Sequence, residues 1–158
     1  IGCMVVDIGG GTTEIAVIAL GGIVCNQSIR VAGDGFTSDI QTYMRHQHNI
    51  KIGERTAEEI KFAVGSALPE LEEPPQDFYV RGPNLMTAMP IEIPISYQEI
   101  GHCLDKSISK IETAQTALAA HLFQNHADDN LNNQPGHAAA NHDQVEMARR
   151  RGSFWKAQ

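Results

Sequence analysis

The fold is decided by Val5-Val6-Asp7-Ile8-Gly9-Gly10-Gly11-Thr12-Thr13-Glu14, where an apolar run meets three glycines and two threonines before a second apolar run. Consecutive glycines let the backbone approach a ligand and turn its amides toward a phosphate, and threonine hydroxyls add donors. Asp7 can hold a hydrated Mg²⁺, which proteins bind through one or two carboxylates together with phosphate oxygens. The alternative is a tight turn whose aspartate only satisfies turn amides, and for an isolated glycine-rich turn this is the commoner case.

Three strands are predicted around and after this stretch. Residues 3–8 and 14–20 are apolar runs on either side of the glycines, and residues 23–31 alternate apolar with polar side chains. Alternation of this kind is typical of a half-buried strand. Gly21-Gly22 is a two-residue hairpin signal. The pattern therefore predicts a three-stranded meander.

Helical periodicity replaces the strand pattern after Gly33-Asp34-Gly35. Apolar residues recur at helical spacing as far as Asn49, a residue type that ends helices. Thr56 and Glu59 form a capping-box pattern at the start of a second helix, which Pro69 ends.

A hairpin and a long helix follow. Residues 77–81 and 86–95 are predicted to pair as two strands. Ser96 and Glu99 form another capping box, and the amphipathic helix that it begins keeps an apolar face as far as Leu118.

The composition changes at residue 125. Asn, His, Ala, Asp and Gln dominate from there, and the few apolar residues cannot offset the entropy of ordering the chain. Residues 125–158 are therefore predicted to be a disordered tail. The histidines lack the i, i+4 spacing of a helical metal site, so no metal pattern is predicted from them.

The bulk composition excludes some classes of function. A net charge of -7 and a pI near 5.4 argue against a general affinity for nucleic acid, because that affinity needs a basic face. Cys3, Cys25 and Cys103 lie far apart in apolar runs and are predicted to be reduced, buried thiols of a cytosolic chain. Residues 15–24 are the longest apolar stretch, far short of the roughly 20 residues that span a bilayer.

The motifs also resemble a known family. Asp-Ile-Gly-Gly-Gly-Thr-Thr-Glu at 7–14 resembles the second phosphate-binding hairpin of the actin, heat-shock chaperone and sugar kinase ATPase superfamily. Three later segments are similar to the bacterial rod-shape-determining MreB family: Ile29-Arg30-Val31-Ala32-Gly33-Asp34, Ile52-Gly53-Glu54-Arg55-Thr56-Ala57-Glu58-Glu59-Ile60-Lys61 and Val80-Arg81-Gly82-Pro83-Asn84-Leu85. The resemblance covers residues 4–118.

The resemblance implies an α/β fold that is part of an actin-like ATPase domain. Residues 1–32 and 97–124 would belong to its second large subdomain, as a three-stranded meander plus helices. Residues 33–96 would form a small α+β subdomain that lines the nucleotide cleft and includes its entry helix. A whole domain of this type is roughly twice as long, and the chain begins with Ile1 rather than Met, so we expect a fragment.

The resemblance also implies a set of ATP-binding residues. The hairpin would receive the β- and γ-phosphates, and Asp7 would lie near Mg²⁺. Glu58 would accept hydrogen bonds from ribose hydroxyls and Lys61 would lie beside adenine, since residues three apart share a helix face. Gly33 would let the chain pass close to the nucleoside. The nucleotide-binding residues implied in this way are Gly9, Gly10, Gly11, Thr12, Gly33, Glu58, Glu59, Ile60 and Lys61. The alternatives are a surface ion pair for Glu58 and Lys61 and a simple helix-entry turn at Gly33.

The function implied by the resemblance is that of an ATP-binding cytoskeletal protein that polymerises into filaments and determines rod cell shape by guiding cell-wall synthesis. Its partners would be further copies and the cell-wall elongation machinery at the inner membrane, with no nucleic acid. It would be cytoplasmic, and the parent protein membrane-associated.

The family's first phosphate hairpin and its water-orienting glutamate do not occur in this sequence. Phosphoryl transfer needs both walls of the cleft, so we expect poor or absent ATP hydrolysis by this chain alone. Two alternatives stay open: an inactive truncated remnant that only interacts with the parent filament, and a chaperone- or sugar-kinase-type ATPase.

Overall fold

The structure, a computed structural model, describes residues 2–129 of the 158-residue chain. Its elements are β1 (Gly2–Ile8), β2 (Thr13–Ala19), β3 (Gly22–Ile29), α1 (Gly33–Gln47), α2 (Glu54–Val64), β4 (Phe78–Pro83), β5 (Pro90–Ile95) and α3 (Tyr97–Asp129). The predicted α/β class is confirmed. Residues 125–129 of the predicted tail belong to α3, and residues 130–158 lie outside the described part.

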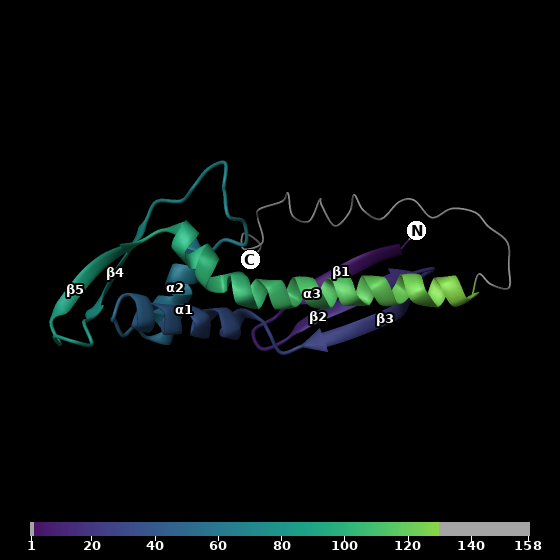
Figure 1. Cartoon of the computed structure of the whole chain (residues 1–158), viewed down its shortest axis with the longest axis horizontal. Helices are drawn as coiled ribbons and strands as arrows, with labels where there is room; N and C mark the ends of the chain where they lie inside the picture. Colours follow the sequence, from purple (N-terminus) through teal and green to yellow (C-terminus); the bar gives the residue numbers. More distant parts are fainter. Residues whose placement is uncertain (1, 130–158) are drawn as a thin grey trace.

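The first three strands form an antiparallel sheet in the order β1-β2-β3, which is the predicted meander (Figure 1). The turn between β2 and β3 differs from the prediction. Leu20 (φ 53°) and Gly21 (φ 79°) occupy the two turn positions, while Gly22 already pairs with Ala19. Two consecutive positive φ angles match the twist of a two-residue hairpin, and the strand register places them one residue earlier than the glycine pair.

The helix α3 runs along one face of this sheet and continues over the helices at the other end of the molecule (Figure 1). Ile15 and Val17 of β2 pack with Ala114 and Leu118 of α3 in one core cluster. On the opposite face of the sheet Val5 is 46% exposed. The alternation of the strands therefore buries the face that α3 covers.

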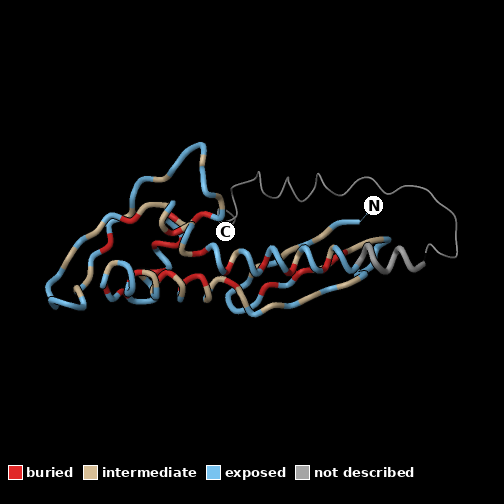
Figure 2. Tube along the Cα trace, viewed as in Figure 1, coloured by how far each residue is buried: buried red, intermediate tan, exposed pale blue. Residues whose placement is uncertain are grey.

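A second, larger core lies where α1, α2, the β4-β5 hairpin and the start of α3 meet. Figure 2 shows buried residues concentrated there. This cluster includes Phe36, Ile40, Met44, Ile50, Ile60, Val64, Val80, Ile95, Ile100 and Leu104. The helix α3 contributes residues to both cores, so the cores do not separate residues 33–96 from residues 97–124. The predicted subdomain boundary between residues 96 and 97 therefore stays a prediction.

Two of the predicted helix starts are wrong. The helix α1 begins at Gly33 and includes the Gly33-Asp34-Gly35 segment. The helix α2 begins at Glu54, and its N-cap Gly53 offers no side chain. The capping box predicted at Thr56 does not form, because this residue already lies inside the first turn.

The predicted end of α1 and start of α3 are observed, whereas α2 ends earlier than predicted. Asn49 follows α1 with a φ of 52°, as expected of a helix stop. The Ser96 hydroxyl accepts a hydrogen bond from the Glu99 amide at 3.3 Å, which is one half of the predicted capping box, while the Glu99 carboxylate accepts from the Tyr43 hydroxyl at 2.9 Å. The helix α2 ends at Val64, before the predicted Pro69, and Gly65 is its C-cap.

The second arm of the β4-β5 hairpin begins at Pro90 rather than at residue 86. Residues 84–89 form a turn instead, closed by the Asn84 amide, which donates to the Met89 carbonyl at 2.9 Å. The Asn84 side chain accepts from the Met86 amide at 2.8 Å, which is the local bonding that favours asparagine in turns.

The cysteine prediction is wrong in part. All three thiols are unpaired, Cys25 and Cys103 are partly buried, and Cys3 is exposed because it lies on the outward face of β1. Within residues 2–129, no helix combines the length and the apolar character that a membrane span requires.

Candidate phosphate-binding site

The loop between β1 and β2 is the centre of the candidate site. The register pairs Ile8 with Thr13, and the Gly9 amide donates to the Thr12 carbonyl at 2.9 Å to close the loop. The buried Thr13 hydroxyl donates to the Val31 carbonyl at 2.6 Å and ties the loop base to the chain entering α1. Residues 9–12 are exposed, so the loop is held at its base and open at its tip.

The loop supplies the cap of α1. The Gly33 amide donates to the Gly9 carbonyl at 3.0 Å, and the Asp34 amide donates to the Gly10 carbonyl at 2.8 Å. These are among the first amides of a helix, which have no partner inside it, and the N-cap Ala32 has no side chain to offer. Backbone carbonyls of the glycine loop take that role.

The same contacts decide where the loop amides point. In a trans peptide the C=O and the following N–H point in opposite directions, and the described chain has no cis peptide. The carbonyls of Gly9 and Gly10 face α1, so the amides of Gly10 and Gly11 face away from it. Within the described residues, no hydrogen bond is recorded for these two amides, the Thr12 amide or the Thr12 hydroxyl. Clustered donors of this kind make a concavity that suits an anion.

Close packing explains Gly33 but not Gly10, where an added Cβ would make an ordinary van der Waals contact. A Cβ at Gly33 would lie 3.3 Å from the Gly9 carbonyl oxygen and 3.7 Å from the Gly10 Cα. A Cβ at Gly10 would lie 3.4 Å from an oxygen of the Asp34 carboxylate. Gly33 therefore admits the loop against the first turn of α1, a role that sequence reasoning did not assign to it.

Two carboxylates face each other beside the loop. Asp7 and Glu14 are direct partners in the β1-β2 register, and both are exposed. Like charges placed opposite one another on a sheet are destabilising, and a bound cation would relieve the repulsion. The Ser28 hydroxyl donates to Glu14 at 2.6 Å and holds one of the two carboxylates.

This pair suits a magnesium ion that also binds phosphate oxygens. Among the described residues, no group of three or more His, Cys, Asp or Glu could hold a metal. The magnesium role assigned to Asp7 stays a prediction. Sequence reasoning did not pair Asp7 with Glu14, which counting outward from the loop along an antiparallel hairpin would have found.

The side chain of Lys61 on α2 reaches the first turn of α1, where the glycine loop is attached. This side chain is buried, and its Nζ donates to the Gly33 carbonyl at 3.2 Å and to the Thr37 hydroxyl at 3.0 Å. The Glu58 carboxylate lies 3.7 Å from that Nζ and is about half exposed. Lys61 thus ties α2 to the first turn of α1, and sequence reasoning missed Thr37 as its partner.

The other two predicted residues of α2 lie elsewhere. Glu59 accepts from Arg55 at 3.2 Å on an exposed surface, and Ile60 is fully buried in the larger core. The structure therefore brings Gly9, Gly10, Gly33, Glu58 and Lys61 together, but not Glu59 or Ile60. Nucleotide contacts for all the predicted residues stay predictions.

A family model described as MreB/Mbl protein matches residues 1–129. The chain belongs to the MreB/Mbl family.

Curated members of the family are similar over most of the described chain. The cell shape-determining protein Mbl of Bacillus subtilis (strain 168) is 41% identical over 113 residues, which are 72% of this chain and 33% of that protein. The cell shape-determining protein MreB of Escherichia coli (strain K12) is 44% identical over 113 residues, 72% of this chain and 32% of that protein. The chain thus spans about a third of the length of the curated relatives it matches.

Solved structures confirm the predicted partial actin-like fold. MreB5 of Spiroplasma citri bound to AMPPNP has a TM-score of 0.68 at 36% identity, covering 85% of this chain and 36% of that one. The MamK double helical filament has a TM-score of 0.56 at 18% identity, covering 74% of this chain and 35% of that one, and shows likeness of fold alone.

Proposed function

We propose that this chain is part of an ATP-binding, actin-like cytoskeletal protein whose filaments determine rod cell shape by guiding cell-wall synthesis. The observation that carries the nucleotide part is the pair of unbonded amides at Gly10 and Gly11 that face away from α1, with the unbonded Thr12 amide next to them in the loop. A phosphate placed there would receive donors that the fold itself leaves unused. The Asp7 and Glu14 carboxylates beside the loop would hold Mg²⁺ between the protein and the phosphates.

The AMPPNP-bound relative from Spiroplasma citri supports ATP as the nucleotide, because AMPPNP is an ATP analogue. In this proposal the loop binds the β- and γ-phosphates, while Glu58 and Lys61 lie on the nucleoside side of the cleft. Lys61 is engaged by the first turn of α1, so its contribution would include holding α1 against α2 as well as contacting the base.

Activity is proposed for the parent protein rather than for the chain alone. The described residues supply one phosphate-binding loop, and phosphoryl transfer needs positioning and charge stabilisation from the whole cleft. The alternative of an inactive remnant that only joins the parent filament predicts the same loop geometry. Membership of the MreB/Mbl family favours a cell-shape protein over the chaperone and sugar kinase alternative.

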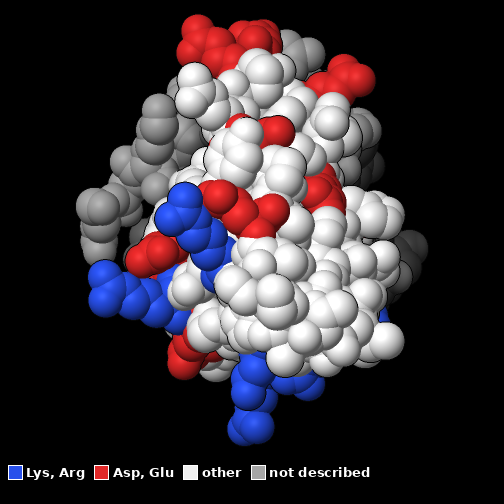
Figure 3. All heavy atoms as spheres, turned by 90° about the vertical axis from the view of Figure 1, so that its left-hand side faces the viewer, with Lys and Arg blue, Asp and Glu red and all other residues white. Residues whose placement is uncertain are grey.

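Self-association is supported by the end of the molecule that carries the β4-β5 hairpin. Tyr79, Met86 and Met89 are 63%, 80% and 63% exposed there. Figure 3 views this end and shows a broad uncharged surface with charged side chains around it. Exposed apolar groups of this size mark interaction surfaces, and we infer a second copy as the partner because the chain belongs to the MreB/Mbl family. We also propose that the parent protein works with the cell-wall elongation machinery. It would do so in the cytoplasm, in association with the inner membrane.

Titration calorimetry of the 158-residue chain with ATP and Mg²⁺ tests the nucleotide part. We compare Gly11→Ala with Gly22→Ala, since a Cβ at either position meets no atom within 4 Å. Only the first places a methyl group on the open loop, so only the first should weaken binding, by about tenfold for a loss of roughly 1.4 kcal/mol. No heat at millimolar nucleotide, or equal affinities for the two variants, would contradict the proposed site.

Co-sedimentation with MreB of Escherichia coli under ATP tests the cytoskeletal part. We expect the chain to pellet with the polymer, and a chain that stays in the supernatant would count against filament association.

A further inference from the structure

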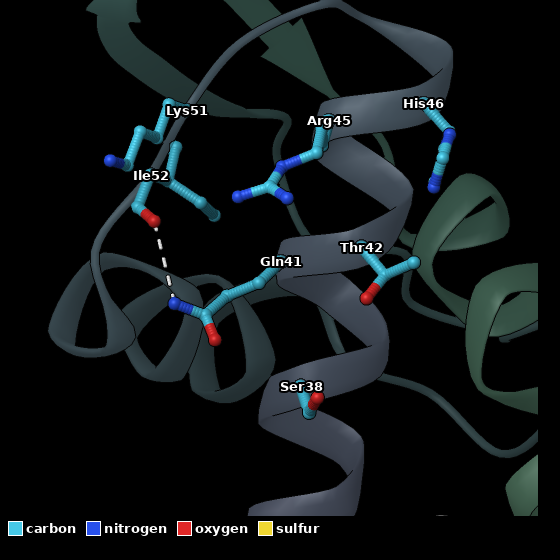
Figure 4. Close-up of a pocket in the computed structure, with 7 residues that line it drawn as sticks. All are labelled: Ser38, Gln41, Thr42, Arg45, His46, Lys51 and Ile52. Atoms are coloured by element: carbon cyan, nitrogen blue, oxygen red, sulfur yellow. Dashed lines mark hydrogen bonds between the residues drawn. The ribbon is translucent and has the colours of Figure 1, made fainter.

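A second polar pocket lies along α1 and the segment that connects it to α2. It is a hollow of about 320 Å³ lined by Ser38, Gln41, Thr42, Arg45, His46, Lys51 and Ile52 (Figure 4). None of these residues belongs to the glycine loop or to the predicted nucleotide-binding residues. We refer to it as the Arg45 pocket.

The charge of the Arg45 pocket is entirely basic. Its lining contains no carboxylate, and Arg45 and Lys51 enter no ion pair with any residue whose side chain the structure describes. Figure 4 shows the Arg45 guanidinium extending toward the segment that carries Lys51. Elsewhere Arg55 and Arg81 each contact a glutamate. In a chain of net charge -7, two neighbouring cations without a carboxylate partner are suited to an external anion.

The hydroxyls of the Arg45 pocket are also uncommitted. Thr37 and Thr113 donate to the carbonyl four residues earlier in their helices, at 3.1 Å and 2.7 Å, as helical threonines commonly do. No such bond is recorded for Ser38 or Thr42 within the described residues. Their hydroxyls are therefore available as donors along the same stretch of α1.

The fold holds Lys51 in place. The Gln41 side-chain amide donates to the Ile52 carbonyl at 3.4 Å, and Ile52 is 8% exposed. The Lys51 amide donates to the Pro83 carbonyl at 3.4 Å. Because the backbone on both sides of Lys51 is fastened, binding of a ligand has only the exposed side chain of Lys51 left to order, which lowers the entropy cost of binding.

We propose that the Arg45 pocket binds the phosphate monoester group of a small soluble molecule. Such a group carries nearly two negative charges at neutral pH and three acceptor oxygens. Arg45 would bind two of the oxygens with its planar guanidinium, while Lys51 acts as a point charge and the Thr42 hydroxyl, one helical turn from Arg45, bonds the remaining oxygen. A carboxylate has one charge and two oxygens and would leave one cation unmatched. The volume is at the small end of ligand pockets.

Amide NMR shifts of the 158-residue chain test the proposal, with glycerol 3-phosphate and inorganic phosphate as probes at an ionic strength of about 0.15 M, where the Debye length is about 8 Å. The expected result is a saturable shift confined to residues 38–52. Shifts confined to residues 9–12 would instead locate the phosphate on the glycine loop and overturn the proposal.

The matched variants are Arg45→Gln with Lys51→Gln and, as control, Lys106→Gln with Lys110→Gln. Each pair removes two exposed cations, but the control pair lies on α3 outside the pocket. We expect the first pair to weaken glycerol 3-phosphate binding at least about tenfold, because charge-assisted hydrogen bonds are lost. The control pair should change the affinity less than about twofold, since exposed charges are screened by salt. Circular dichroism confirms that both variants fold.

Three results would overturn the proposal. Equal weakening by both pairs would show a general charge effect rather than a pocket. Equal binding of chloride and glycerol 3-phosphate would show no preference for a phosphate group. Binding to vesicles that contain phosphatidic acid, without binding to glycerol 3-phosphate, would make the ligand a lipid surface.

Discussion

Replacing Gly33 by alanine should separate the glycine loop from α1, and the structure allows a close control. The new Cβ would lie 3.3 Å from the Gly9 carbonyl oxygen. That oxygen accepts the Gly33 amide at 3.0 Å, so the methyl group pushes against the atom that caps the helix. A Cβ at Gly35, two residues further along α1, meets no atom within 4 Å.

Both substitutions gain the stabilisation that comes from replacing a helical glycine by alanine, but only Gly33→Ala also introduces a steric conflict with the glycine loop. Alanine in place of a helical glycine stabilises by about 0.4–1 kcal/mol at a compatible position. Overpacking costs about 1–3 kcal/mol, and each of the two loop-to-helix hydrogen bonds contributes about 0.5–1.5 kcal/mol net if it is lost. We therefore expect Gly35→Ala to stabilise by about 0.5 kcal/mol and Gly33→Ala to destabilise by about 1–2 kcal/mol.

Urea unfolding followed by circular dichroism measures the difference. With an m-value of about 2 kcal/mol per molar, the midpoints of the two variants should differ by about 1 M, with the wild-type chain between them. Gly33→Ala should also weaken ATP binding, because the amides of Gly10 and Gly11 owe their direction to the same contacts. A Gly33→Ala protein as stable as Gly35→Ala would show that the loop does not depend on this approach, and would refute the reasoning.

Three further predictions concern other parts of the molecule. Burial raises the pKa of the Cys103 thiol to about 12, so at about pH 8.5 iodoacetamide should modify the exposed Cys3 first and Cys103 only after denaturant is added; equal rates, read by peptide mass spectrometry, would be inconsistent with the buried position. Burial and the hydrogen bond to Glu99 raise the pKa of Tyr43 to about 12, above its ordinary 10.0, so its contribution to stability is complete below about pH 10 and is lost as the pH rises through about 12. Urea midpoints of Tyr43→Phe and wild type should therefore converge as the pH rises above about 10, and a constant difference would contradict this. Ser96→Ala should cost about 1 kcal/mol of unfolding free energy through loss of the α3 cap, and an unchanged midpoint would show that the cap is not needed.

Most of the local structure could be predicted because its causes lie a few residues apart. Alternation over residues 23–31 indicated a strand, Asn49 marked a helix end, and Ser96 with Glu99 marked a helix start. The wrong helix starts also came from patterns that span only a few residues. Thr56 matched a capping box although α2 had already begun at Glu54, because a pattern of residue types does not show which of two neighbouring turns begins the helix.

In the candidate site, too, local features could be predicted from the sequence and features that depend on tertiary contacts could not. The sequence alone determined that Gly9, Gly10, Gly11 and Thr12 form a loop between two strands, since only local turn chemistry is involved, and the resemblance to the family added the prediction that this loop binds phosphate. Tertiary structure decided which way the loop amides point, because that direction depends on hydrogen bonds to the first turn of α1.

Tertiary structure also decided the partners of the charged residues. Lys61 and Glu58 share a helix face by spacing alone, but burial of Lys61 against Gly33 and Thr37 depends on the packing of α2 on α1. Asp7 and Glu14 likewise lie opposite one another only because of the register between β1 and β2. Residue spacing thus determined which groups could act, and contacts between elements distant in the sequence determined which of them meet.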